Sequence, residues 1–174
     1  MELQILHAIQ ELHTDLLDSI MILLSTLGNA GLIWIFLSIV LVFPKRTRRC
    51  GFTMMGAMAL SFLLGNLLLK NLIARPRPCA VDTSVRLLIP FPGEYSFPSG
   101  HSLNGFTAAT VIFLYFKKAG AFALLLAASI AFSRLYLFVH YPTDIFGGMI
   151  LGILDAAFIF WIVKKVIQRR EGRL

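Results

Sequence analysis

Charge of either sign is scarce in this sequence. Of its 174 residues only 14% are charged and 57% are hydrophobic, and the mean hydropathy is +0.79. These values are too apolar for a soluble domain of this size. The net charge of +7 does not indicate nucleic acid as a partner, because the basic residues stand in short clusters between long apolar stretches. We therefore predict a membrane protein that has no nucleic-acid partner.

Cysteine is also scarce, and a cleavable leader is not evident. Cys50 and Cys79 are the two cysteines, and the predicted topology places them on opposite membrane faces. This excludes a disulfide framework and leaves too few soft ligands for a metal site. Met1-Glu2 opens the chain without basic residues, and no small-residue cleavage pattern follows the first apolar run. We expect this run to remain in the mature protein as a span.

Five apolar runs alternate with polar connections, of which only the proline-containing loop over about residues 71–97 is long, a length that usually indicates a function. Most of the runs approach the ~20 residues that a membrane-spanning helix needs. Pro98 suits the first turn of a helix, so the short third run is expected to start several residues earlier. The sequence therefore predicts an all-α fold, a polytopic transmembrane helix bundle in one domain over residues 1–174. The predicted spans are residues 20–43, 51–69, 102–116, 119–139 and 143–163.

Small residues and one acid stand out within these spans. Gly28-Asn29-Ala30-Gly31 either kinks the first span or admits a neighbouring helix, and close packing is the simpler interpretation. Gly148, Gly152 and Ala156 indicate a packing face on the fifth span. Asp155 falls near the middle of that span, where an acid costs roughly 2.5–3.5 kcal/mol on insertion scales. The favoured interpretation is that Asp155 makes a structural hydrogen bond within the bundle. The alternative is that it belongs to an ion or proton pathway.

The first fifteen residues have a different pattern. Leu3, Leu6 and Ile9 recur at helical spacing among polar residues, which predicts an amphipathic helix over residues 1–15. This helix is too polar to cross a bilayer and is expected to lie on its surface. Its two histidines, His7 and His13, are expected to face water.

Basic residues orient the predicted spans. Eleven of them share one face, which the positive-inside rule makes cytoplasmic: Lys45, Arg46, Arg48, Arg49, Lys117, Lys118, Lys164, Lys165, Arg169, Arg170 and Arg173. The outer face, opposite to it, carries Lys70, Arg75, Arg77, Arg86 and Arg134. Charges there break the trend and need another explanation.

Three of these outer cations belong to sequence clusters that suit an anion. Lys70, Arg77 and Arg134 can neutralise the oxygens of a phosphoryl group, and the planar fork of arginine matches phosphate well. Ser99 and Gly100 lie at a predicted helix start, where free backbone N–H groups and the helix dipole attract anions. The predicted spans bring all these residues to one membrane depth, so they predict a phosphate-binding site on the outer face.

Two histidines and an aspartate supply the chemistry that phosphoryl transfer needs. One of His101 and His140 can attack phosphorus, and the other can protonate the departing oxygen. Asp144, four residues after His140, is placed to hold one ring nitrogen so that the other is free to attack. The residues alone leave open which histidine has which role.

The order and spacing of these clusters resemble a known family. Lys70 with Arg77-Pro78, then Pro98-Ser99-Gly100-His101, then Ser133-Arg134 with His140 and Asp144 match the three-part signature of the type 2 phosphatidic acid phosphatase (PAP2) superfamily. Each motif alone is weak, but three in order make a strong signal. The resemblance covers residues 70–148 directly, and the hydropathy around them is similar to that of compact bacterial members.

The resemblance implies a membrane lipid phosphatase without a metal or other cofactor. It implies that His140 is the nucleophile that forms a phosphohistidine, that Asp144 orients it, and that His101 is the acid that later activates water. It also implies phosphate contacts from Lys70, Arg77, Ser99, Gly100, His101 and Arg134. The partners are then the bilayer and a lipid phosphate: undecaprenyl diphosphate, phosphatidic acid, phosphatidylglycerol phosphate or lipid A phosphate. The enzyme would be a multi-pass protein of the plasma (inner) membrane, with its site toward the periplasm or exterior.

Other functions remain open at this point. A phosphohistidine can pass its phosphoryl group to an acceptor lipid instead of water, which gives a lipid-to-lipid phosphotransferase. Asp155 and the small size of the bundle also suit a transporter or lipid scramblase, whose activity would survive His140→Ala. An inactive family member is the third alternative, although every expected chemical residue is present.

Overall fold

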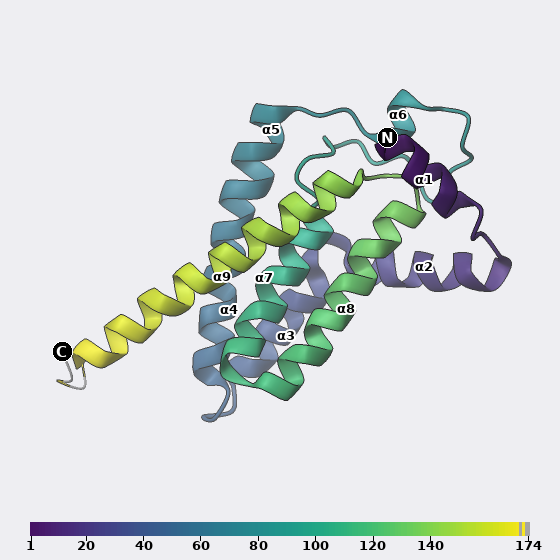
Figure 1. Ribbon diagram of the computed structural model, residues 1–174. Helices are drawn as coiled ribbons and strands as arrows, with labels where there is room; N and C mark the ends of the chain where they lie inside the picture. The colour runs from purple at the N-terminus through teal and green to yellow at the C-terminus, as the bar shows by residue number, and fades with distance from the viewer. Residues whose placement is uncertain (171, 173–174) are drawn as a thin grey trace.

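The computed structural model describes residues 1–170 and Gly172 as a bundle of helices (Figure 1). The all-α prediction is confirmed for this part of the chain. The α-helices are α1 (Glu2–Gln10), α2 (Asp15–Leu27), α3 (Leu32–Val42), α4 (Arg48–Ser61), α5 (Lys70–Ile73), α6 (Pro78–Val81), α7 (Gly100–Tyr115), α8 (Lys117–Tyr136) and α9 (Pro142–Arg170). A 3₁₀ turn (Asn29–Gly31) joins α2 to α3, and a π-helical segment (Phe62–Leu69) joins α4 to α5.

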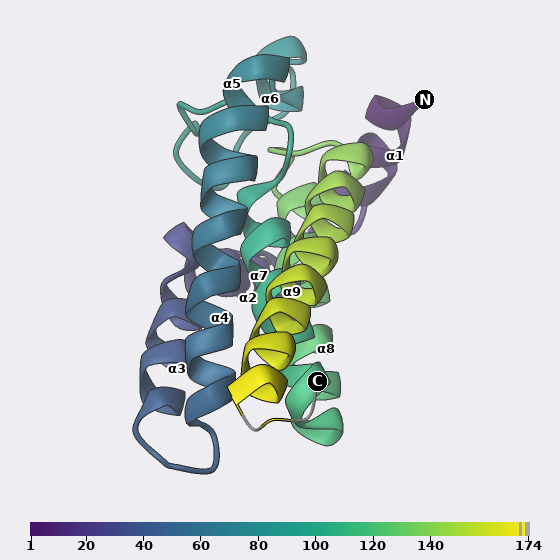
Figure 2. The same ribbon diagram turned by 90° about the vertical axis from the view of Figure 1, so that its left-hand side faces the viewer.

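Helix α7 lies at the centre of the bundle and packs against α4, α8 and α9 (Figures 1 and 2). Small residues permit the close approach. A Cβ on Gly105 of α7 would lie 3.1 Å from the Cβ of Ala127 on α8, and a Cβ on Gly148 of α9 would lie 2.7 Å from the carbonyl oxygen of Ser99. The predicted packing face of residues 148, 152 and 156 is therefore confirmed, and it faces α7.

The structure does not confirm the predicted number of five membrane spans. Within the described residues, three helical stretches are long and apolar enough to cross a membrane: Arg48–Val81, Lys117–Tyr136 and Pro142–Arg169. A fourth arises if α2 and α3 form one broken span. Helix α7 has 16 residues, about 24 Å at 1.5 Å per residue, which is shorter than the ~30 Å hydrocarbon core. The count of five stays a prediction.

The first predicted span is broken at its glycines. Helices α2 and α3 meet at an angle of 44°, and α2 runs across the bundle rather than along it (Figure 1). The break is built from left-handed backbone at Ala30 (φ 51°) and Gly31 (φ 69°). Close packing is present as well, because a Cβ on Gly28 would lie 2.6 Å from the His101 ring. Both interpretations of this segment thus apply.

The start of α7 differs slightly from the prediction. Pro98 precedes the helix instead of standing in its first turn, and Ser99 is the N-cap residue. The Ser99 hydroxyl accepts a hydrogen bond from the Ser102 N–H at 3.5 Å. A serine at this position satisfies one of the free N–H groups of the first turn, which explains why the helix begins here.

Helix α1 is anchored on the bundle near the predicted outer face. Leu6 is completely buried beside Tyr136 and Phe138. His7 is exposed, as expected, although its Nε2 also lies 2.8 Å from Asp82 Oδ2. His13 is only partly exposed, because its ring stacks on Tyr136 at 4.2 Å. These partners come from distant parts of the chain, so the local pattern gave no sign of them.

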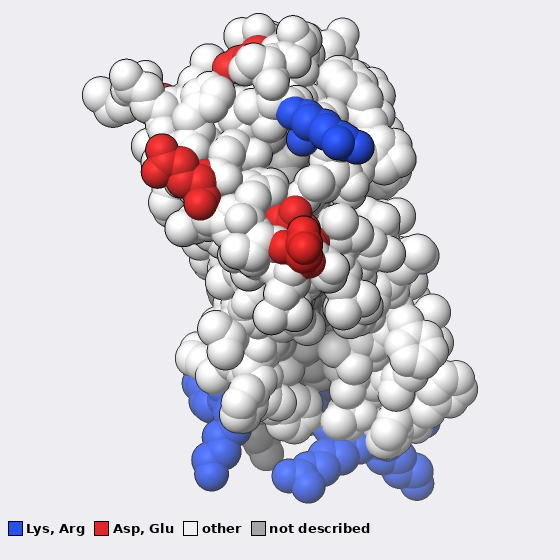
Figure 3. All heavy atoms as spheres, turned by 90° about the vertical axis from the view of Figure 1, so that its right-hand side faces the viewer, with Lys and Arg blue, Asp and Glu red and all other residues white. Residues whose placement is uncertain are grey.

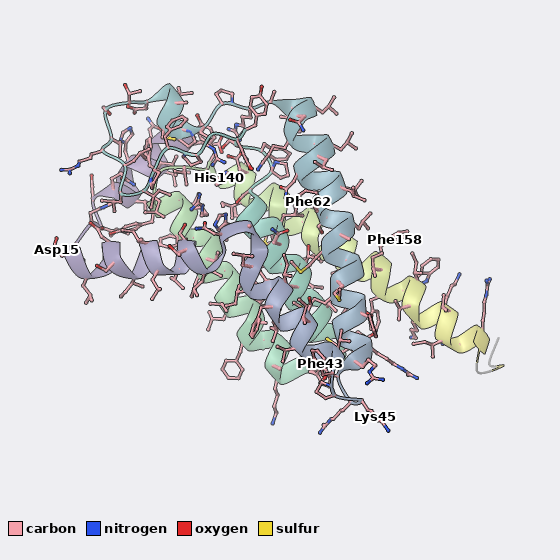
Figure 4. All side chains as sticks on the ribbon, turned by 180° about the vertical axis from the view of Figure 1, so that it is seen from behind. Asp15, Phe43, Lys45, Phe62, His140 and Phe158 are labelled. Carbon is pink, nitrogen blue, oxygen red and sulfur yellow. The ribbon has the colours of Figure 1, made fainter. Side chains whose placement is uncertain are left out.

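Charged side chains are unevenly distributed over the surface. On the face that Figure 3 shows, most Lys and Arg side chains gather at one end, acidic side chains and one basic side chain lie toward the other end, and an uncharged band separates the two ends. The basic end contains Lys45, on the loop between α3 and α4, and His140 lies at the opposite end (Figure 4). The clustering is therefore as predicted for the described part of the chain. Arg173 and the side chain of Arg170 lie outside the described residues.

Asp155 has the hydrogen bond that the sequence required. It is buried, and its Oδ2 accepts a hydrogen bond from the Ser61 hydroxyl at 2.7 Å. Ser61 Oγ in turn lies 2.8 Å from Thr107 Oγ1. The acid therefore ties α9 to α4 and α7, in agreement with the favoured interpretation.

Substitution of Gly152 tests the contact between α7 and α9. A Cβ at this position would lie 2.6 Å from the carbonyl oxygen of Leu103 and 2.9 Å from Thr107 Oγ1, and backbone cannot easily move away. We expect Gly152→Ala to lower the free energy of unfolding in mixed micelles by about 1–3 kcal/mol, the usual cost of overpacking. Gly56→Ala is the matched control, because its Cβ would meet only Ile159 Cγ2, at 3.5 Å. Equal stability of the two variants would contradict the close contact.

Candidate active site

A cavity of about 690 Å³ opens among α3, α4, α7 and the loop before α7. Its polar wall holds the residues that the sequence singled out, and its apolar wall comes from α3 and α4. The polar lining includes Lys70, Arg77, Gly100, His101, Arg134, His140, Asn66, Asn104 and Glu94. The apolar lining includes Ile35, Ile39, Met55, Met58, Ala59 and Phe62. In Figure 4, Lys45 lies at one end of the bundle, and His140 lies beyond Phe62, the first residue of the π-helical segment, toward the opposite end.

Helix ends and loops position these groups at one level. Lys70 directly follows the π-helical segment, Arg77 directly precedes α6, and His101 stands in the first turn of α7. Arg134 lies in the last turn of α8, and His140 lies in the short connection between α8 and α9. Short π-helical segments occur frequently at functional sites, and here the segment delivers the lysine. The structure thus brings the three predicted clusters together.

The imidazole of His140 presents Nε2 as a base. The Nη1 atom of Arg77 lies 3.0 Å from His140 Nε2 and 2.8 Å from the carbonyl oxygen of Val139. A guanidinium only donates hydrogen bonds, so Nε2 accepts and the ring hydrogen belongs on Nδ1. An unprotonated Nε2 is the form that can act as a nucleophile.

Asp144 lies behind His140, on the side away from the cavity. Its Oδ2 is 3.5 Å from His140 Nδ1, longer than an ordinary hydrogen bond. Ser96 bridges the two, because its hydroxyl lies 3.4 Å from His140 Nδ1 and donates to Asp144 Oδ2 at 2.5 Å. The Tyr141 N–H donates to the same oxygen at 2.8 Å. The carboxylate is therefore held in position by donors from the loop and the start of α9.

Burial and charge keep His140 in its neutral form. Burial lowers the pKa of His140, the neighbouring Asp144 partly opposes this effect, and the positive charges of Arg77 and Arg134 lower the pKa further. A neutral imidazole at physiological pH is the form required of a nucleophile, so the environment suits the role predicted for this residue.

Two buried polar atoms at the cavity have no hydrogen-bond partner within the described residues: Arg134 Nε and Asn66 Oδ1. Buried polar groups rarely stay unpaired in native proteins, and such a group calls for an explanation. Arg134 also donates through Nη1 to the Ser25 hydroxyl. This bond fixes the guanidinium, while its Nε–H has no acceptor among the described residues. A phosphoryl oxygen is an acceptor of the kind that Arg134 Nε lacks.

The two residues at the start of α7 have different surroundings. Gly100 lines the cavity, where an added Cβ would lie 3.3 Å from Asn66 Oδ1. Ser99 is fully buried, and its hydroxyl serves the helix cap. The side chain of Ser99 is therefore engaged by α7, and the part of the predicted anion cradle nearest the cavity is Gly100.

His101 faces the cavity from the other side. Its Nε2 lies 3.1 Å from the carbonyl oxygen of Ser25 and 3.2 Å from Asn29 Oδ1. A carbonyl only accepts, so Nε2 carries the ring hydrogen and points toward the break between α2 and α3. The bent first helix pair thus has a clear role in the site: it orients His101.

Glu94 places a carboxylate against the predicted phosphate site. Its Oε2 accepts from Lys70 Nζ at 2.5 Å, and its carbonyl oxygen accepts from Arg77 Nε at 2.6 Å. The hydrogen bond and charge of Lys70 lower the pKa of Glu94, so it is ionised at neutral pH. A phosphorylated substrate must displace this carboxylate from Lys70 or tolerate its repulsion.

Removal of the Glu94 charge should therefore favour substrate binding. We expect Glu94→Gln to lower KM about 3–10-fold with a smaller change in kcat, because a competing anion near Lys70 is lost while the site geometry is kept. Steady-state phosphate release measures both constants. Asp82→Asn is the control, since Asp82 contacts His7 and Ser84 rather than the cavity. A raised KM would instead mean that Glu94 holds Lys70 in place for the substrate.

Sequence reasoning missed several residues at the site, among them Asn66 in the cavity wall. Ser96 and Glu94 lie in the irregular loop before α7, Arg75 binds Asp144 Oδ1 at 2.6 Å, and Glu2 binds Arg75 at 2.6 Å. Arg75 did carry a signal, since it is one of the outer-face cations that the topology left unexplained. Nothing in the periodicity of residues 1–15 indicated a role for Glu2.

Comparison with known proteins agrees with the geometry. A family model described as the PAP2 superfamily matches residues 50–168. The chain is 34% identical over 137 residues to an undecaprenyl-diphosphatase of Sulfolobus acidocaldarius, with 78% of this chain and 66% of that protein covered. It is 36% identical over 110 residues to the bacitracin transport permease protein BcrC of Bacillus licheniformis, with 63% of this chain and 54% of that protein covered. The matches thus extend over less than two thirds of the length of these two relatives. The crystal structure of Aquifex aeolicus LpxE superimposes with a TM-score of 0.78 at 29% identity, over 91% of this chain and 94% of that one.

Proposed function

Since the chain belongs to the PAP2 superfamily, we propose that it is a lipid phosphatase that removes phosphate from a lipid phosphomonoester or diphosphate through a phosphohistidine intermediate. It is an integral membrane protein with several apolar helices of spanning length. The proposal assigns the catalytic roles to His140, His101 and Asp144. It assigns phosphate contacts to Lys70, Arg77, Gly100 and Arg134 around the cavity, and to the Ser99–Gly100 backbone at the start of α7.

One observation carries the proposal: a single cavity joins a cationic end to an apolar wall. Lys70, Arg77 and Arg134 lie at one end, and side chains of α3, α4 and the start of the π-helical segment form the other. Several of these apolar residues, including Ile39, Met55 and Phe62, are exposed. A molecule with a phosphorylated head and a hydrocarbon tail fits both parts, with its tail among helices that are themselves embedded in lipid.

The reaction can be written with the residues in these positions. His140 Nε2 forms a bond to phosphorus while the bond between phosphorus and the lipid oxygen breaks. This step needs His101 as an imidazolium: its Nε2–H stays bound to the Ser25 carbonyl, and the second ring hydrogen, on Nδ1, passes to the departing oxygen. Burial and the positive charge of Arg134 lower the pKa of His101 to about 3, and the negative charge of a bound phosphate favours the protonated ring again. Water then loses a proton to His101 and attacks phosphorus, which breaks the N–P bond and releases inorganic phosphate. The cations stabilise the charge on the transferred group.

The orientation follows from charge. The site lies at the end of the bundle opposite the basic cluster (Figure 4), and the positive-inside rule makes the basic end cytoplasmic. We infer a location in the plasma membrane with the site toward the periplasm or exterior. Cleavage of a lipid phosphate in the outer leaflet of sealed, right-side-out vesicles, without cleavage of the same lipid confined to the inner leaflet, is the result expected of this orientation.

The test is release of inorganic phosphate by the purified chain in detergent, with a chelator present. The panel is undecaprenyl diphosphate, phosphatidic acid, phosphatidylglycerol phosphate and lipid A phosphate. We expect release from at least one of them. Loss of all release on chelation, with recovery on addition of Mg²⁺, would overturn the histidine mechanism. Transfer of labelled phosphate to a second lipid, instead of its release, would support the phosphotransferase alternative. The bond from Ser61 gives Asp155 a structural role, and movement of substrate across the membrane that survives His140→Ala would support the transporter alternative.

A further inference from the structure

Glu2, far away in sequence, contacts the residues around Asp144. Its Oε1 accepts from the Thr143 N–H at 3.1 Å and from the Thr143 hydroxyl at 2.7 Å, and its Oε2 accepts from Arg75 Nη2 at 2.6 Å. Thr143 stands in the first turn of α9, whose N–H groups lack partners within the helix. Glu2 therefore caps the helix that carries Asp144, although it belongs to another helix.

Arg75 connects Glu2 to the catalytic carboxylate. Its Nη1 donates to Asp144 Oδ1 and to Thr143 Oγ1, each at 2.6 Å, and its guanidinium lies 4.0 Å from the centre of the Tyr141 ring. Ser96 and the Tyr141 N–H occupy the other oxygen, Oδ2, on the His140 side. Arg75 thus fixes the rotation of the carboxylate from the side opposite the nucleophile, with a planar fork that holds two acceptors at once.

We propose that Glu2 and Arg75 are positioning residues for the reaction, which act through Asp144 to hold His140 in its attacking orientation. This inference rests on the proposed function. Arg75 is shared between two carboxylates, so Glu2 keeps the guanidinium in place and neutralises part of its charge. The charge left on Asp144 then remains available to stabilise the histidine when it becomes cationic on phosphorylation.

The contact of Glu2 with Thr143 and Arg75 does more than hold α1 on the bundle. Leu6, in the middle of α1, is itself completely buried, and Gln10 Nε2 donates to the carbonyl oxygen of Tyr136 at 3.0 Å. Helix α1 therefore stays docked without Glu2. Burial raises the pKa of Glu2, but hydrogen bonds from Thr143 and Arg75 lower it by more, so the carboxylate is ionised at neutral pH. A charged group at this place has an electrostatic effect that an apolar anchor lacks.

The experiment compares kcat and KM of Glu2→Gln, Arg75→Met and the double variant, on whichever lipid phosphate the wild type hydrolyses. Glutamine keeps the shape and an acceptor for Thr143 but loses the charge. We expect kcat to fall about 3–10-fold for Glu2→Gln and about 10–100-fold for Arg75→Met, the latter being the range known for groups that orient a functional histidine. KM should stay within about twofold, because neither residue is placed in the phosphate-binding wall. Glu11→Gln, at the exposed end of α1, is the matched control.

The double variant distinguishes positioning from a structural role. If Glu2 acts through Arg75, its loss adds less than about twofold to the loss in Arg75→Met, since coupled residues are not additive. Multiplied losses, or a Glu2→Gln protein with wild-type kcat, would overturn the inference. So would a kcat loss that matches a drop in the folded fraction, measured by thermal unfolding in the same detergent. Absence of phosphate release by the wild type would defeat the proposed function instead, which is a separate outcome.

Discussion

Phosphate release by His140→Ala is expected to fall by about 10⁴-fold or more, with the folded state kept. The scale follows from hydrolases in which removal of the nucleophile leaves only the binding and electrostatic contributions of the site. Here those contributions come from Lys70, Arg77 and Arg134, which line the cavity independently of His140. The substrate should therefore still bind, and a lipid phosphate should protect the variant against thermal unfolding as it protects the wild type.

The intermediate itself provides a second measurement. Rapid quenching of wild type with a ³²P-labelled lipid phosphate should trap labelled protein whose bond is stable in alkali and labile in acid, as expected of phosphohistidine. The label should be absent from His140→Ala and present in His13→Ala, since His13 stacks on Tyr136 away from the cavity. Label on His140→Ala, or activity within tenfold of wild type, would assign the nucleophile to another residue.

The sequence predicted the catalytic cluster because hydropathy and motifs carry complementary information. Apolar runs of similar length bring Lys70, His101 and His140 to one depth, and the motif spacing gives their chemical types. The cavity of this structure confirms that they lie together. Roles for individual residues do not follow from depth, which is why they remain proposals.

The parts that could not be predicted depend on irregular backbone. The break between α2 and α3 requires positive φ at Ala30, a residue type that gives no sign of such a conformation. Ser96 and Glu94 lie in a loop without periodicity, and their contacts with Asp144 and Lys70 join segments 48 and 24 residues apart in sequence. Pattern reasoning describes regular elements well, whereas these contacts depend on how the loop folds over the bundle.

Asp144→Asn is expected to lower kcat by roughly 10³–10⁴-fold, a scale seen when the acid of a comparable triad becomes an amide. In the native site Asp144 accepts every bond: Arg75 donates to Oδ1, and Ser96 and the Tyr141 N–H donate to Oδ2. An asparagine has one NH₂ group, and either orientation turns that donor toward an existing donor. The pattern that places the ring hydrogen of His140 on Nδ1 is then lost.

The tautomer of His140 decides how the loss should appear. If the amide donates toward Nδ1, the ring hydrogen moves to Nε2, where it faces Arg77 Nη1 across the present 3.0 Å contact. Two donors then oppose each other, and the attacking nitrogen no longer has a free lone pair. Because Asp144 is not among the cavity-lining residues, we expect KM to change little while kcat falls. Asp144→Glu keeps the charge but moves it. We expect this variant to recover only part of the rate, because the position of the carboxylate matters as well as its charge. A large rise in KM with kcat unchanged in Asp144→Asn would place Asp144 in substrate binding and contradict its role behind His140.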